Sequence, residues 1–160
     1  MLTEFINKLT NISKWLALIT MGFMMFFIAI GVVSRALFKP ILGDVELVQL
    51  GMVVLIICGL AYTETVNGHI SIGLFVDRLS NKIQKIIDIF TYVISMLICF
   101  IFSYIYFQVF INHLTNRRLS TDLLSIPYYP FDLLISIGFL LWGLQLLLKV
   151  IKAVRNDSKG

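Results

Sequence analysis

The chain has 160 residues, of which 59% are hydrophobic and only 14% are charged, and its formal net charge is +4. Soluble domains carry about a quarter charged residues, and a chain of this length cannot enclose so much apolar surface in one aqueous core. The composition therefore excludes an ordinary soluble domain and favours a membrane protein. The basic residues lie at the ends of apolar segments rather than in a stripe, which argues against nucleic-acid binding.

Four long stretches carry no charged residue, namely 15–34, 47–63, 89–111 and 133–148. A helix needs ~20 residues to cross the hydrocarbon of a bilayer. The stretches are continuously apolar rather than alternating, which favours helices over a membrane barrel. With their flanking residues they predict spans at about 15–37, 45–66, 86–112 and 130–152. The predicted fold class is all-α, a single integral membrane domain (residues 1–160) with four transmembrane helices.

A semi-polar segment at about 70–85 separates the second predicted span from the third. Its apolar residues fall at steps of three and four, with polar residues filling much of the remainder. This pattern is typical of an amphipathic helix that lies in the membrane surface. The apolar positions of this predicted interfacial helix are Ile72, Phe75, Val76, Leu79 and Ile83.

The distribution of basic residues predicts the orientation. Lys and Arg concentrate on the cytoplasmic side of membrane proteins. With four spans, both termini and the 70–85 segment share one side, and that side holds nine of the thirteen Lys and Arg residues. The other side holds Arg35, Lys39, Arg117 and Arg118. We therefore predict that the termini and the interfacial helix are cytoplasmic.

The spans hold no charged residue near their centres. A protein that moves a solute usually keeps costly polar groups there, whereas Arg35, Glu46 and Glu64 lie near span ends. The two histidines, His69 and His113, fall on opposite sides of the membrane and cannot ligate one haem together. No nucleophile–base pair, phosphate loop or metal-ligand cluster indicates an enzyme. We expect no catalytic residue, cofactor or metal, and infer an accessory subunit.

Small residues in two spans indicate helix packing. One stripe repeats every four residues in the third span and consists of Thr91, Ser95, Cys99 and Ser103. Gly51 and Gly59 lie two turns apart in the second span. Small residues allow helices to approach closely in membranes, either within the chain or against a partner, and for the stripe we favour packing within the chain.

Two interfacial residues, Arg35 and Glu46, end the first span and begin the second. They either form an ion pair within a structured outer surface or are solvated independently, and the sequence favours neither alternative. At the other end of the second span, Gly68 is expected to end the helix in a left-handed conformation. For His69 we favour a structural role at this helix end over proton transfer.

The chain resembles the small membrane subunit (DctQ-like, Q-type) of tripartite ATP-independent periplasmic (TRAP) transporters over roughly residues 8–152. The first matching features are Ser34-Arg35 at the end of the first span, Pro40, and Glu46 at the start of the second. The others are Gly59-Leu60-Ala61-Tyr62 and the motif Gly68, His69 and Ile70 with Asn67 before it. Gly73 stands where the family often has an acidic residue, and Gly43-Asp44-Val45 stand directly before Glu46, where the family often has a tryptophan.

The resemblance implies a non-catalytic subunit in the bacterial inner membrane. A soluble periplasmic binding protein (P-type) would capture an organic acid such as a C4-dicarboxylate or a sialic acid. A large membrane subunit (M-type) would move this acid across the membrane together with sodium. The small subunit would be a scaffold for the large subunit. Residues 70–85 would then lie on the membrane surface, with their apolar side chains in contact with lipid. The candidate docking residues for the periplasmic protein are Arg35, Lys39, Asp44, Glu46, Arg117, Arg118 and Asp122.

Two other functions remain open from the sequence. One is an independent small four-helix transporter, although the first span lacks the titratable carboxylate that proton-driven export needs. The other is a membrane anchor subunit of a redox complex. Solute flux by the chain alone would indicate the first, and a visible absorption spectrum would indicate a haem-bearing form of the second.

Overall fold

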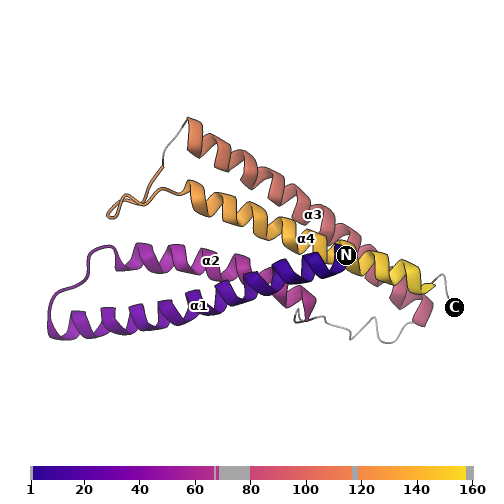
Figure 1. Cartoon of the computed structure of the whole chain (residues 1–160), viewed down its shortest axis with the longest axis horizontal. Coiled ribbons are helices and arrows are strands. Elements are labelled where there is room, and N and C mark those ends of the chain that lie inside the picture. Colours follow the sequence, from indigo (N-terminus) through magenta and orange to yellow (C-terminus); the bar gives the residue numbers. More distant parts are fainter. Residues whose placement is uncertain (1, 67, 69–79, 117–118, 158–160) are drawn as a thin grey trace.

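The structure is a computed structural model, and it describes residues 2–66, 68, 80–116 and 119–157. Four helices account for most of these residues (Figure 1): α1 (Leu2–Leu37), α2 (Asp44–Thr65), α3 (Asn81–Thr115) and α4 (Tyr129–Asp157). Over the described ranges there is no strand, only an isolated bridge between Ser120 and Pro127. All four helices are long and apolar enough to cross a membrane. The prediction of an all-helical chain with four such helices is confirmed.

The helices extend beyond the predicted spans. α1 has 36 residues and begins at Leu2, which makes it ~54 Å long against ~30 Å of hydrocarbon. Lys14 ends the uncharged run 15–34, but the helix continues past Lys14 and Lys8, because Ile6 and Thr10 on the same segment are buried. Similarly, α4 continues past Lys149 and Lys152 to Asp157.

The third helix begins directly after Ser80, whose carbonyl accepts hydrogen bonds from the amides of Ile83 and Gln84 at 2.9 and 3.1 Å. Ile83 therefore lies in the first turn of α3 and not in a separate helix. Its side chain is exposed. Ile72, Phe75, Val76 and Leu79 lie outside the described residues, so the predicted interfacial helix stays a prediction.

The chain forms two antiparallel hairpins, α1–α2 and α3–α4 (Figure 1). The contacts run in the order α1, α2, α4, α3, and the start of α1 also reaches α4. The hairpins diverge from the end that holds both chain termini, here called the terminal end, towards the end that holds residues 38–43 and 119–128, here called the rim end. Only 6% of the most apolar window of α1 is buried, against 39% for α4. Thus α2 and α4 form the centre.

Close helix contacts in this centre depend on glycine. A side chain at Gly138 would collide with Ile57 of α2, and one at Gly143 would lie 3.2 Å from the ring of Phe100 of α3. Ser103 and Ser136 add reciprocal hydrogen bonds between α3 and α4, because each hydroxyl donates to the other residue's carbonyl, at 2.9 and 2.8 Å. Small residues and hydroxyls are typical of helix interfaces in membranes.

Candidate functional site

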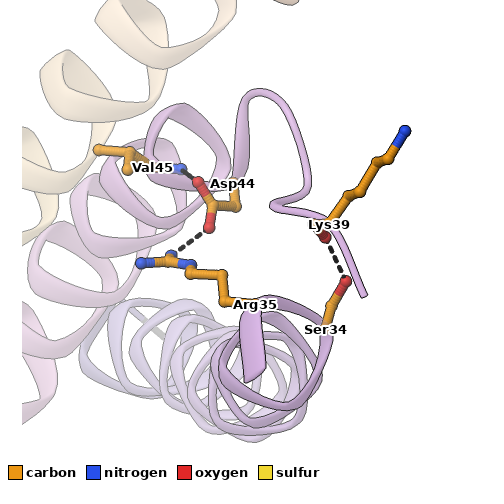
Figure 2. Close-up of polar contacts among 5 residues, drawn as sticks. All are labelled: Ser34, Arg35, Lys39, Asp44 and Val45. Carbon is orange, nitrogen blue, oxygen red and sulfur yellow. Dashed lines mark hydrogen bonds and ion pairs between the residues drawn. The ribbon is translucent and has the colours of Figure 1, made fainter. Parts of the chain in front are cut away.

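At the rim end, an ion pair joins the last turn of α1 to the first residue of α2. Arg35 Nη2 contacts Asp44 Oδ2, and Asp44 Oδ1 accepts the amide of Val45 at 2.8 Å (Figure 2). The Arg35 side chain is 55% exposed, whereas that of Asp44 is only 14% exposed. The partner of Arg35 in the structure is thus Asp44 and not Glu46. Both residues of this pair were among the predicted docking residues.

The connection between α1 and α2 is held by its own hydrogen bonds. The Ser34 hydroxyl donates to the carbonyl of Lys39 at 2.7 Å, and the amide of Phe38 donates to the carbonyl of Ser34 at 2.8 Å. The Lys39 side chain points away from the Arg35–Asp44 pair (Figure 2). Lys39 therefore presents its charge at the surface of the rim end.

Glu46 binds a segment that lies far away in the sequence. Its two carboxylate oxygens accept the backbone amides of Leu123 and Leu124 at 2.8 and 3.0 Å. These residues belong to residues 119–127, here called the rim turn, which connects α3 to α4. Hydrogen bonds to an ionised acceptor are stronger than neutral ones. Glu46 therefore ties the start of α2 to the connection between α3 and α4.

A glycine next to this link accommodates the rim turn. Gly43 precedes α2 and has φ 81°, a backbone conformation that other residues adopt at a cost. A Cβ atom at Gly43 would lie 2.5 Å from Cγ of Leu124. Leu124 thus packs directly over the backbone of Gly43, and both the conformation and the contact require glycine here.

A second pair at the rim end joins α3 to α4. His113 Nδ1 lies 2.7 Å from Asp132 Oδ2, and both side chains are mostly buried.

Asp122 is exposed on the rim turn. Arg117 and Arg118 lie outside the described residues, so their predicted docking role stays a prediction.

At the terminal end, charged side chains are buried between α2 and α4. Glu64 is 6% exposed, forms an ion pair with Lys149, and accepts the indole Nε1–H of Trp142 at 3.1 Å. The Lys149 ammonium also lies 5.6 Å from the ring centroid of Tyr92 on α3. We call these four residues the inner polar cluster. The charged side chains of Glu64 and Lys149 therefore neutralise each other inside the bundle.

α1 is attached beside this cluster by neutral hydrogen bonds. Gln145 Nε2 donates to Thr10 Oγ1 at 2.8 Å and to Asn7 Oδ1 at 3.3 Å. The Ser13 hydroxyl donates to the carbonyl of Cys58 at 2.7 Å. Such hydrogen bonds are a recurrent means of joining membrane helices. The sequence prediction missed this role because these residues are spread over three helices.

The predicted packing residues occupy different surroundings. Cys99 and Ser103 are buried at the contact with α4, whereas Ser95 is half-buried and Thr91 exposed. Gly51 lies against Met24 of α1. Gly59 has open space where a side chain would be.

The motif at the end of α2 is described only at Gly68, whose amide donates to the carbonyl of Thr63 at 2.8 Å. Gly68 does not adopt the expected left-handed conformation. Among the described glycines, the one with positive φ is Gly43. His69 and Ile70 lie outside the described residues.

Within the described ranges, no group of three or more His, Cys, Asp or Glu residues is placed to hold a metal ion.

The geometry defines a multi-pass helical membrane protein whose buried polar side chains join its helices to one another. The chain matches the family described as "Tripartite ATP-independent periplasmic transporters, DctQ component" over residues 24–156. It therefore belongs to this family and is the small permease component of a TRAP transporter. A search of curated proteins gave no match.

Proposed function

We propose that this subunit is a non-catalytic scaffold for the large membrane subunit of its transporter. The observation that carries the proposal is the side-by-side order α1, α2, α4, α3, which leaves long apolar faces on the two flanking helices. Phe26 on α1 is 75% exposed and Ile101 on α3 is 57% exposed. Extended apolar faces of this kind fit lipid or another membrane helix. A groove of about 340 Å³ between α1 and α2, lined by Phe27, Gly31 and Met52 among others, adds to the apolar surface.

The solute and its coupling ion belong to the large subunit in this proposal. Family membership supports uptake of an organic acid, such as a C4-dicarboxylate, a sialic acid or a similar carboxylate, driven by sodium. Several polar side chains that lie within the described part of the bundle join one helix to another, as the Glu64–Lys149 and Gln145–Thr10 contacts illustrate. This use agrees with a scaffold rather than a pathway.

We further propose that the rim end faces the periplasm and that both termini are cytoplasmic. The greater number of basic residues on the side of the termini supports this orientation. Docking of the periplasmic binding protein would then involve Arg35, Lys39, Asp44, Glu46 and Asp122, with Arg117 and Arg118. The part of the predicted interfacial segment that precedes α3 would lie on the cytoplasmic membrane surface.

Photo-crosslinking tests the scaffold proposal. A photoreactive residue at Phe26 or at Ile101 is expected to crosslink this chain to the large subunit when the two are co-expressed, because these side chains are exposed on the outside of the bundle. A photoreactive residue in place of Leu146, which is only 2% exposed, is the control and should give no such product. Failure of the large subunit to crosslink from either exposed face, or to co-purify with this chain, would contradict the proposal.

A further inference from the structure

We infer that Glu46 is a positioning residue for the docking surface: it holds the rim turn in one conformation, and Leu123 at the tip of this turn contacts the periplasmic binding protein. The inference rests on the proposed function, since it assigns the periplasmic partner to this face. It differs from a direct charge contact at Glu46, because the carboxylate is already engaged by two amides of the turn.

The rim turn is closed by its own backbone and fixed from outside by Glu46. The amide of Thr121 donates to the carbonyl of Ile126 at 2.9 Å, and the amide of Ser125 donates to the carbonyl of Thr121 at 3.1 Å. Ser125 has φ 52°, a conformation that residues other than glycine keep only when their surroundings hold them there. The carboxylate of Glu46 supplies that support by binding two consecutive amides.

The two leucines held by Glu46 have different surroundings. Leu124 packs over Gly43 and thereby joins the turn to α2, although it is still 38% exposed. Leu123 is 64% exposed, even though its amide is fixed. An apolar side chain on a preorganised turn gains affinity, because little conformational entropy is lost when it binds. Leu124 therefore holds the turn against α2, and the exposed side chain of Leu123 is available to contact a partner.

The composition of the turn favours a soluble protein over lipid as that partner. Ser120, Asp122 and Ser125 flank the leucines, and Ser120 and Asp122 are exposed. A charged carboxylate and exposed hydroxyls disfavour insertion into hydrocarbon. Asp122, directly before Leu123 in the chain, adds a negative charge beside it. The partner surface that fits is an apolar depression with a polar margin.

Amide hydrogen exchange tests the positioning role in the complex of small and large subunits in lipid nanodiscs. Glu46→Ala is expected to speed the exchange of the Leu123 and Leu124 amides by about tenfold or more, because it removes both acceptors. Glu46→Gln should have a smaller effect, since its single carbonyl oxygen still accepts. Asp44→Asn removes an equal charge two residues away and is the control that should leave these amides protected. Unchanged protection in Glu46→Ala would overturn the positioning role.

Affinity for the periplasmic binding protein of the same transporter, loaded with its organic acid, tests the docking role. Glu46→Ala and Leu123→Ser should each weaken binding by about tenfold, and Leu123→Ser should do so with the Leu124 amide still protected. Wild-type affinity in Leu123→Ser would overturn the contact, although the proposed function would survive. If the wild-type complex bound no periplasmic protein at all, the proposed docking function itself would fail.

Discussion

Lys149→Met is expected to lower the free energy of unfolding by about 3 kcal/mol, because it removes the ammonium that forms an ion pair with the buried Glu64 carboxylate. The hydrogen bond that Glu64 keeps from the Trp142 indole has a neutral donor, and it does not replace the ion pair. The value lies at the lower end of the range for buried pairs, since the Lys149 side chain is 22% exposed. Equilibrium unfolding in mixed micelles, followed by far-ultraviolet circular dichroism, measures the change.

Two further variants separate loss of the pair from loss of packing. Glu64→Gln combined with Lys149→Met removes both charges, and this double variant should be more stable than Lys149→Met alone, because replacing both members of a buried pair is far less costly than removing one. Lys152→Met, at an exposed lysine one turn further along α4, should change stability by at most about 0.5 kcal/mol. A single variant as stable as the double variant would contradict the account of the inner polar cluster.

Gly138→Ala is expected to destabilise the bundle by about 2 kcal/mol. The added methyl group would collide with the Ile57 side chain and lie 3.2 Å from the Ile57 carbonyl oxygen. Ile57 is buried, and a β-branched side chain in a helix has few rotamers with which to move away. The helices α2 and α4 would then have to separate at the centre of the molecule.

Gly59→Ala is the matched control for this prediction, since no atom other than those of the adjoining residues and helix backbone lies within 4 Å of the position its side chain would occupy. The same chemical change there should be neutral, or should stabilise the isolated chain by up to about 1 kcal/mol through helix propensity. The same unfolding measurement compares both variants. Equal stabilities of the two variants would mean that α2 and α4 do not approach as closely as the structure has them.

The number and type of elements could be predicted because each helix contains one long apolar stretch, and hydrocarbon allows few alternatives to a helix. The helix ends could not be predicted in this way. A lysine ends an apolar run, but the helix continues wherever neighbouring residues still pack, as Ile6 and Thr10 do in α1. At its start α3 likewise extends past charged residues, and it begins directly after Ser80, whose carbonyl accepts hydrogen bonds from the first turn.

The candidate site was predictable in its location but not in its contacts. The sequence places Arg35, Asp44 and Glu46 near each other, yet it cannot say that Arg35 pairs with Asp44. The partners of Glu46 are backbone amides 77 and 78 residues away. Backbone amides carry no residue-specific signal, so the sequence gives no indication of this contact.

The buried pair and the close-packed glycines were missed for a related reason. Glu64 and Lys149 each lie at the end of an apolar run, where extension into water is the usual outcome. Only the adjacency of α2 and α4 brings them together. The same adjacency brings Gly138 into close contact with Ile57. In contrast, Gly59, for which the sequence predicted helix packing, faces open space.

Uptake by proteoliposomes tests most directly whether this chain is a scaffold subunit rather than a transporter. Vesicles that hold the small and large subunits, with the periplasmic binding protein outside, should accumulate the organic acid when sodium is supplied. Vesicles with the small subunit alone should show no uptake above empty vesicles, and omission of the small subunit should abolish uptake by the large one. Uptake by the small subunit alone, or full uptake without it, would contradict the account.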